Sequence, residues 1–131
     1  MDQLWAPWRM EYIQREKDYS QGCVFCIKAE DIENDRNNLV LYRDDDIYVV
    51  MNLYPYTNGH LLICSNQHTD TLKDFNQTTL TKVMELAKQI MGILDNTMNP
   101  DGFNFGANLG KAAGAGIAEH IHFHVVPRWK G

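Results

Sequence analysis

The strongest constraint on the fold is a short stretch near the end of the chain in which polar and apolar side chains alternate. Residues 120–126 read His-Ile-His-Phe-His-Val-Val. Side chains two residues apart lie on the same face of a β-strand, so a strand here carries three imidazoles on one face and apolar side chains on the other. Successive imidazoles are then expected roughly 6.5–7 Å apart along the strand. The alternation therefore predicts a sheet with one polar face at this strand.

The patterns elsewhere supply the other elements of an α+β fold. Residues 39–43 and 47–51 are rich in β-forming residues and are joined by a short acidic turn, which predicts a hairpin. A third strand is expected at 60–64 and a further one at 103–108. Between them, apolar residues recur at three- and four-residue steps over 78–98, as in an amphipathic helix. Short strand connections favour an antiparallel sheet of about five strands with the helix packed on it.

The length of the chain predicts one domain. With 131 residues, 44% of them hydrophobic, the chain can bury a core without disulfide bonds. The first 38 residues show only weak periodicity and are interpreted as an irregular N-terminal arm, with the core at 39–131. Two of the three tryptophans, Trp5 and Trp8, lie in that arm and the third is Trp129; terminal aromatics of this kind are expected to dock on the core or on a partner.

Charge and cysteine content indicate which kinds of partner are disfavoured and in which cellular compartment the protein is expected. The formal net charge is −5, which disfavours electrostatic binding to nucleic acid. No apolar run is long enough to cross a membrane, and the N-terminus lacks the pattern of a secretory signal. The three cysteines are an odd number and fit a reducing compartment, so a cytoplasmic location is expected. Cys64 follows three apolar residues and is interpreted as a buried thiol.

The histidines point to chemistry. All five fall in two regions, with His60 and His68 around the third strand and the other three in the alternating stretch. A polar sheet face with solvated histidines is the alternative, but three imidazoles in strict alternation favour a nucleophile, an acid or a metal ligand.

The alternating stretch is similar to the signature of the histidine triad (HIT) superfamily. Further agreement comes from Asn52, which lies eight positions before His60, and from an Asn-Leu-Gly segment that begins at Asn108. The opening Leu-Trp-Ala-Pro-Trp-Arg, the cysteine pair and the closing Val-Pro-Arg-Trp resemble the branch of diadenosine tetraphosphate phosphorylases and hydrolases.

The resemblance implies a nucleotidyl hydrolase or phosphorylase that cleaves dinucleoside polyphosphates. In the family the middle histidine, here His122, attacks phosphorus and forms a covalent nucleotidyl-imidazole. His124 would contact the phosphates or the leaving oxygen, and His60 would help to position the phosphate. The nucleotide-binding positions implied are Asn52, as a ribose contact, Asn108 and Gly116. The acceptor is water or inorganic phosphate, and a homodimer is expected.

The Cys23-Val-Phe-Cys26 pair is open to redox, metal-binding and incidental interpretations from its spacing alone. No strand-loop-helix pattern is recognised around it, which disfavours thioredoxin-like chemistry. The resemblance implies a structural zinc held by Cys23, Cys26, His68 and His120, and it implies no organic cofactor. Without zinc, His120 is instead expected to hydrogen-bond behind His122.

Two features depart from the family pattern or leave room for another function. Residues 116–119 read Gly-Ile-Ala-Glu where many members have Gln and Ser or Thr, and the chain ends at Gly131, where related proteins continue. The glycine-rich loop 110–116 is not followed by a helical pattern, so it is not a dinucleotide fingerprint, although its amides and Lys111 could contact phosphate. A nucleoside 5′-phosphoramidate hydrolase and a zinc-stabilised nucleotide-binding protein without turnover are the alternative functions.

Overall fold

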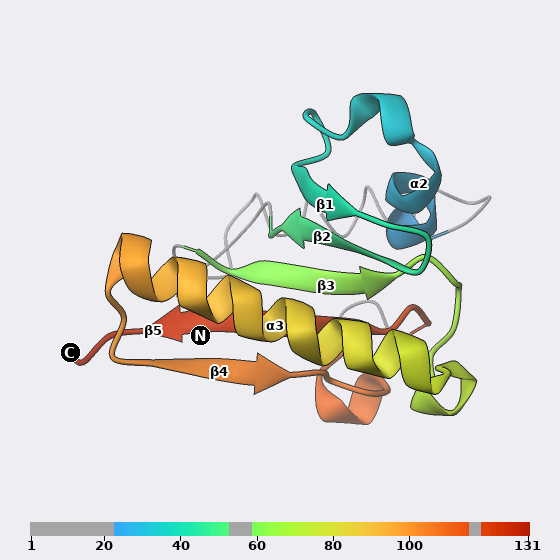
Figure 1. The fold of residues 1–131 in the computed structure, drawn as a ribbon. Coiled ribbons are helices and arrows are strands. Elements are labelled where there is room, and N and C mark those ends of the chain that lie inside the picture. The colour runs from blue at the N-terminus through green and yellow to red at the C-terminus, as the bar shows by residue number, and fades with distance from the viewer. Residues whose placement is uncertain (1–22, 53–58, 116–118) are drawn as a thin grey trace, which may run out of the picture.

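The computed structural model describes residues 23–52, 59–115 and 119–131, which form one sheet flanked by helices (Figure 1). The arm residues Trp5 and Trp8 and the site residue Gly116 lie outside these ranges. The elements in chain order are α2 (Val24–Glu30), η2 (Ile32–Asn34), β1 (Val40–Arg43), β2 (Ile47–Met51), β3 (Leu61–Ser65), η3 (Leu72–Asp74), α3 (Gln77–Met98), β4 (Gly102–Gly106), η4 (Lys111–Ala113) and β5 (His122–Arg128).

The five strands form one antiparallel sheet in the order β1-β2-β3-β5-β4. The last strand, β5, therefore lies inside the sheet between β3 and β4, and β4 forms the edge. The α+β fold expected from the sequence is confirmed. The bounds of β2 are the expected ones, and those of the other strands differ from the expected bounds by at most two residues. The difference that matters for the site is at β5, which begins at His122, so that His120 precedes the strand.

Helix α3 covers one face of the sheet, as the amphipathic pattern predicts (Figure 1). It begins after Asn76, whose side chain accepts from the amide of Thr79, and it ends at Asn99 in the left-handed conformation. One face of the helix packs on alternate residues of the strands. The buried residues of this first cluster are Ile47, Val49, Leu61, Ile63, Phe75, Val83, Ala87, Ile90, Leu94, Ile121 and Val125.

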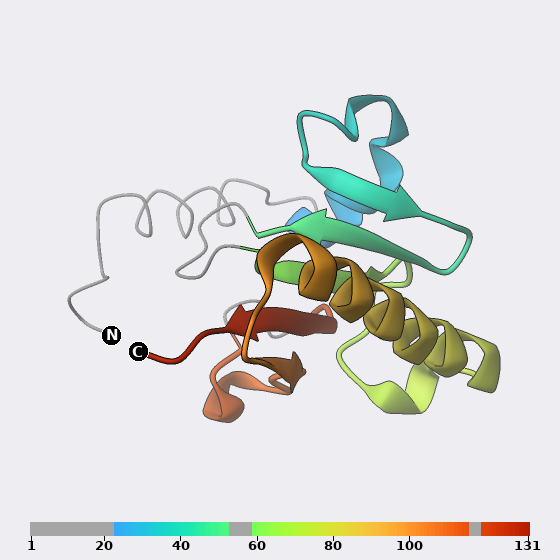
Figure 2. The same cartoon turned by 60° about the vertical axis from the view of Figure 1, so that its left-hand side comes forward.

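Helix α2 corrects the expectation of an irregular arm, at least from Cys23 onward. In Figure 2 its ribbon lies behind β1 and β2, on the side of the sheet away from α3. The helix has only seven residues, so tertiary packing and not propensity stabilises it. Its residues Val24 and Phe25 are buried in a second cluster with side chains of β1, β2 and β3. The cysteine pair therefore opens a helix, which its sequence did not indicate.

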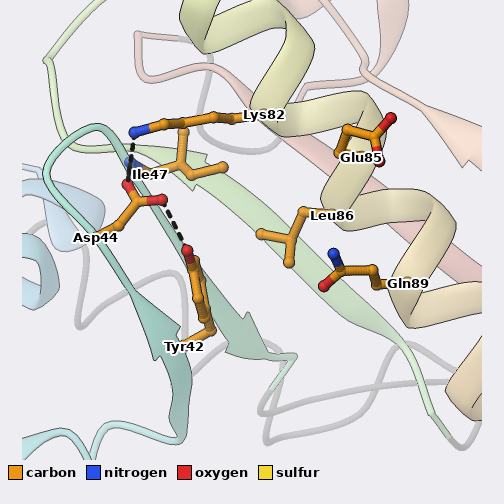
Figure 3. Close-up of a pocket in the computed structure, with 7 residues that line it drawn as sticks. All are labelled: Tyr42, Asp44, Ile47, Lys82, Glu85, Leu86 and Gln89. Atoms are coloured by element: carbon orange, nitrogen blue, oxygen red, sulfur yellow. Dashed lines mark hydrogen bonds and ion pairs between the residues drawn. The ribbon is translucent and has the colours of Figure 1, made fainter.

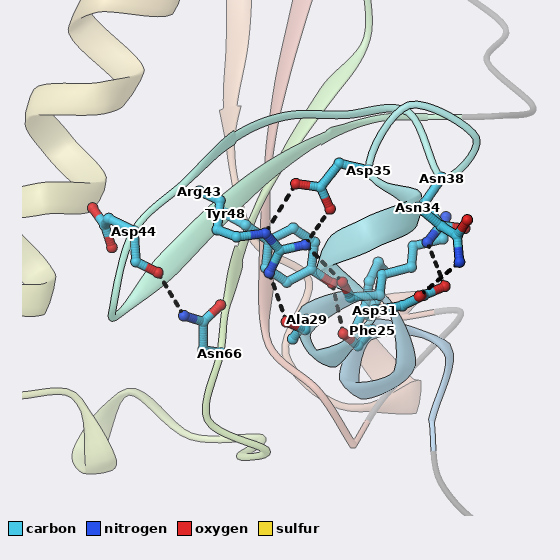
Figure 4. Close-up of polar contacts among 11 residues, drawn as sticks. Phe25, Ala29, Asp31, Asn34, Asp35, Asn38, Arg43, Asp44, Tyr48 and Asn66 are labelled. Carbon is cyan, nitrogen blue, oxygen red and sulfur yellow. Dashed lines mark hydrogen bonds and ion pairs between the residues drawn. The ribbon is translucent and has the colours of Figure 1, made fainter.

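Arg43 fixes the end of α2 to the sheet (Figure 4). Its guanidinium donates to the carbonyl oxygens of Lys28 and Ala29, at 2.9 and 2.6 Å. It also makes a two-point ion pair with Asp35, at 3.0 and 2.6 Å, and this holds the pKa of that carboxyl below its usual value. A cation on the last carbonyls of a helix also complements the helix dipole.

A second ion pair joins the β1–β2 turn to α3. Lys82 donates to Asp46 at 2.5 Å and lies 3.7 Å from Asp44, which in turn accepts from the hydroxyl of Tyr42. Figure 3 shows Tyr42, Asp44 and Lys82 at a cavity of about 150 Å³ between the hairpin and the helix. The cavity lies on the α3 side of the sheet, so it is separate from the histidine face.

Cys64 is fully buried, which confirms the expected buried thiol, and burial raises the pKa of this thiol to about 12. The indole N–H of Trp129 donates to the carbonyls of Met98 and Asn99 at the end of α3, while the residue stays 40% exposed. Within the described residues, no helix combines the length and the hydropathy needed to span a membrane.

We expect Arg43→Met to lower the free energy of unfolding by about 2 kcal/mol. The substitution removes the charged hydrogen bonds to the carbonyls at the C-terminal end of α2, at a site where the Arg43 side chain is only 16% exposed. The matched variant Asp35→Asn keeps the contacts of Arg43 to the carbonyls and should cost less. Denaturant unfolding of both variants measures the difference. An equal loss in the two variants would contradict a role for Arg43 at the helix end.

Candidate active site and metal centre

Three of the predicted site histidines meet on the face of the sheet opposite α3. His122 lies opposite Cys64 of β3, and His124 lies opposite Leu62, so both imidazoles point to the α2 side. The ring centroids of His122 and His124 are 5.1 Å apart, closer than the spacing of alternate strand residues, and the planes of the two rings meet at 66° in an edge-to-face arrangement. His60 joins them from just before β3, with its ring centroid 5.1 Å from that of His124.

His120 lies on the same side of the sheet as His122, because the intervening Ile121 is buried in the α3 cluster and Phe25 of α2 contacts both imidazoles. It stands apart from the pair formed by His122 and His124. It precedes β5, and its neighbour Ile121 donates its amide to the carbonyl of Thr69 at 2.7 Å. That turn points the imidazole of His120 toward the cysteine pair, 3.1 Å from the sulfur of Cys23. The alternating motif therefore serves two places: two histidines on the strand face and one at a buried cluster.

A hydrogen-bond chain fixes the proton positions on His60 and His124. The amide nitrogen of Asn52 lies 3.0 Å from Nδ1 of His60, and because an amide NH₂ only donates, this Nδ1 is the acceptor. Nε2 of His60 then carries the proton and donates to Nδ1 of His124 at 2.9 Å. A neutral His124 therefore bears its proton on Nε2, which suits a donor to phosphate or to a leaving oxygen.

His122 has the opposite tautomer. Its Nδ1 lies 2.9 Å from the carbonyl oxygen of His120 and must donate to it. Nε2 is therefore left with a lone pair, as a nucleophile requires. Burial lowers the pKa of His122, so the lone pair is present at neutral pH.

The other two imidazoles are also neutral at physiological pH. Burial, together with the neighbouring His122, lowers the pKa of His60. Burial, His122 and His60 together lower the pKa of His124 to about 4. A positive charge on one of these imidazoles would be repelled by a charge on another, so the cluster disfavours the binding of additional protons. The neutral rings keep one lone pair and one N–H donor side by side.

A groove beside His124 offers room for a ligand. It has a volume of about 340 Å³ and is lined by residues of β4, β5 and the loop that follows β4: Asn104, Phe105, Gly106, Ala107, Asn108, His124, Val126 and Arg128. Of the predicted nucleotide-binding residues, Asn108 is thus in the groove, while Asn52 bonds to His60 behind it. Asn104 and Arg128 are groove residues that the sequence did not identify as site residues, although Arg128 belongs to the closing Val-Pro-Arg-Trp segment.

The glycine-rich loop is less suited to phosphate than expected. The amides of Ala113, Gly114 and Ala115 already donate to carbonyls of Gly110 and Lys111 within the loop. These three amides are not available to bind an anion. Gly116 lies outside the described residues.

The four predicted metal ligands form one cluster. The sulfurs of Cys23 and Cys26 and the Nδ1 atoms of His68 and His120 all lie within 4.8 Å of one another. The sulfur-to-nitrogen distances are 3.1–3.5 Å. Zinc at its usual bond lengths to thiolate and imidazole would separate tetrahedral ligands by about 3.6 Å. Two sulfurs and two nitrogens at these distances fit a closed tetrahedral zinc site.

Neighbouring groups set the protonation of the ligand atoms in the cluster. Nε2 of His120 donates to the carbonyl of Ser65 at 2.7 Å, which leaves Nδ1 with a lone pair toward the sulfurs. Burial and the neighbouring Cys23 raise the pKa of the Cys26 thiol to about 12. Metal binding must therefore release thiol protons and becomes stronger as the pH rises. His68 is the exposed ligand.

The fold and these groups define a class of protein: an antiparallel α+β domain that holds neighbouring neutral imidazoles on one face, with a separate Cys₂His₂ cluster. The profile of the HIT domain matches residues 33–131. The chain therefore belongs to the HIT domain family.

Individual relatives agree with this assignment. The AP-4-A phosphorylase of Mycobacterium tuberculosis is 35% identical over 136 residues, which cover 100% of this chain and 70% of the relative. The bis(5′-adenosyl)-triphosphatase of Dictyostelium discoideum is 30% identical and the match covers 72% of this chain and 63% of the relative. A zinc-bound histidine triad family protein from Mycobacterium smegmatis has a similar structure, with a TM-score of 0.71, 32% identity and coverage of 86% and 78% of the two chains.

The cluster predicts about one zinc per chain in protein purified without added metal, because four ligands close the coordination sphere. We expect Cys26→Ser to lower the zinc content and the melting temperature. Cys64→Ala is the matched control, since it removes the cysteine outside the cluster and should keep the zinc. Elemental analysis and thermal unfolding measure both effects. A stable wild-type protein without metal would contradict the assignment.

The lowered pKa of His124 predicts how stability depends on pH. Its value in the folded chain is about 4, against 6.5 ordinarily, so below pH 6.5 the unfolded chain binds a proton that the folded chain does not. The free energy of unfolding should fall as the pH is lowered from 6.5 to about 4. His124→Asn should reduce this slope in denaturant unfolding at a series of pH values. Acid release of metal affects both proteins alike, so equal slopes would contradict the prediction.

Proposed function

We propose that this chain is a nucleotidyl hydrolase or transferase that cleaves the phosphoanhydride bonds of dinucleoside polyphosphates through a covalent intermediate on His122. The observation that supports this most is the tautomer of His122, whose Nδ1–H is used by a carbonyl while Nε2 keeps its lone pair. The relatives named as an AP-4-A phosphorylase and a bis(5′-adenosyl)-triphosphatase support the substrate class.

In the first step, Nε2 of His122 attacks a phosphorus atom of the bound nucleotide. A phosphorus–nitrogen bond forms, and the bond from that phosphorus to the bridging oxygen breaks. The leaving nucleotide carries away the bridging oxygen, whose developing charge is stabilised by the Nε2–H of His124. In the second step, water or inorganic phosphate attacks the same phosphorus and the bond to His122 breaks, which restores the lone pair. Each displacement is easier than a direct attack on the anionic substrate.

The other site residues hold this arrangement. His60 keeps the proton of His124 on Nε2, because it donates to the other ring nitrogen, and Asn52 fixes His60 in turn. The groove beside His124 would receive the rest of the substrate, with Asn108 as a polar contact and Arg128 as a cation toward the phosphates. These two residues supply local attraction for an anion that the net charge of −5 does not.

Zinc belongs to the structural part of the proposal. Cys23, Cys26, His68 and His120 would hold it, and a closed set of four protein ligands leaves no position for substrate. Its role would be to stabilise the contact between α2 and the start of β5. The homodimer and the cytoplasmic location implied by the resemblance stay predictions.

Replacement of the nucleophile tests the proposal most directly. His122→Ala should reduce turnover of diadenosine tetraphosphate by about a thousandfold or more, since the covalent step is lost. Binding of a non-hydrolysable analogue should remain measurable by calorimetry. Met84→Ala, on the solvent side of α3, is a control that should keep full turnover. Equal turnover in His122→Ala and the wild type would overturn the mechanism.

The products of the wild type identify the acceptor. ADP and ATP formed only with inorganic phosphate would indicate a phosphorylase, and AMP and ATP formed without it would indicate a hydrolase. Turnover of adenosine 5′-phosphoramidate instead would favour the phosphoramidate hydrolase. Nucleotide binding with no turnover of either substrate would favour the binding protein.

A further inference from the structure

Phe25 lies between the metal cluster and the nucleophile. Its ring centroid is 4.7 Å from that of His122 and 5.5 Å from that of His120. The side chain is 2% exposed, so it has no room to move away from either ring. The flat ring therefore limits how far the imidazole of His122 can tilt.

The position of Phe25 depends on the two cysteines that flank it. Cys23 is the N-cap of α2, and its sulfur accepts from the amide of Cys26 at 3.3 Å. The carbonyl of Phe25 also accepts from the hydroxyl of Tyr48 at 2.7 Å. Phe25 thus belongs to the first turn of a short helix whose start is tied to the cluster.

A second connection runs through the backbone of His120. The carbonyl of His120 accepts from Nδ1 of His122 and so decides which ring nitrogen keeps the lone pair. The β3–β5 ladder ends at the pair of Cys64 and His122, so His120 lies beyond it. Its place is held by the bond of its own Nε2 to Ser65 and by the cluster.

We propose that Phe25 is a positioning residue for His122, and that metal occupancy of the Cys₂His₂ cluster sets the orientation and tautomer of the His122 imidazole through Phe25 and the carbonyl of His120. Without a metal, the four ligands have only weak thiol-to-imidazole contacts to hold α2 against the start of β5. The inference rests on the proposed function for its kinetic consequence, but not for its geometry.

A simple space-filling role for Phe25 makes different predictions. Truncation of a core side chain lowers stability, but it leaves kcat unchanged while the protein stays folded. A positioning role lowers kcat with little change in KM, because the substrate contacts remain and only the attack geometry is lost.

The first test compares Phe25→Leu with Phe75→Leu in zinc-loaded protein at a temperature where both are folded. Phe75 is a buried phenylalanine on the opposite face, where it packs against Phe123. We expect Phe25→Leu to lower kcat by about tenfold with KM nearly unchanged and its zinc retained. Phe75→Leu should lower the melting temperature and leave kcat unchanged. An unchanged kcat in folded, zinc-loaded Phe25→Leu would overturn the proposal.

The second test measures the tautomer of the His122 imidazole directly. Ring ¹⁵N NMR of the zinc-loaded wild type at fixed pH should show His122 as a single Nδ1–H tautomer. Phe25→Leu, and separately the folded wild type after zinc chelation, should show a mixture of tautomers. A single Nδ1–H tautomer in both would contradict the inference. The Phe25→Leu arm is independent of the stability of the metal-free protein, so it decides alone where chelation unfolds the chain.

The two tests separate this inference from the proposed function. If zinc-loaded wild type turns over no nucleotide substrate, the proposed function fails, whereas the NMR comparison still decides whether Phe25 and the cluster orient His122. If turnover is found and the tautomer does not respond to Phe25→Leu, only the inference fails.

Discussion

The site depends on the pairing of β5 with strands on both of its sides. The ladder to β3 places His122 and His124 opposite Cys64 and Leu62, and the ladder to β4 places Gly106 opposite His124. A slip of one residue in either ladder would turn both imidazoles into the α3 core and bring Phe123 and Val125 to the site face. The apolar contacts of Val125 with the α3 side thus select the register that the chemistry requires.

The two faces of the sheet differ in composition: one carries the larger apolar core and the other carries the titratable groups. The α3 face carries the larger apolar cluster, and a long helix with a well-formed N-cap covers it. The α2 face combines a smaller cluster with the titratable groups, and its short helix depends on Arg43, Tyr48 and the cysteine pair. Stability is therefore concentrated on one side, while the other side holds polar groups whose geometry has to be supported from outside the strand.

Proton positions, and not net charge, give the site its chemical character. One chain of hydrogen bonds runs from Asn52 through His60 to His124, and a separate bond runs from His122 to the backbone. Burial lowers the pKa of all three imidazoles, and neighbouring histidines lower those of His60 and His124 further, so the rings are neutral and these bonds indicate which nitrogens donate and which accept. Neighbouring residues of the same type thereby acquire opposite roles.

The sequence by itself determined the fold class, the long helix and the histidine face, because periods of two and of about 3.6 residues are local properties of a chain. It also supplied the four metal-ligand candidates, although only through a family resemblance. Local pattern cannot express three features that tertiary contacts decide: that α2 forms at all, that the imidazole of His120 meets the cysteine pair, and that Phe25 lies between two imidazoles. Each of these depends on contacts between residues far apart in the chain, such as His120 with Cys23, whose energies no short window of sequence contains.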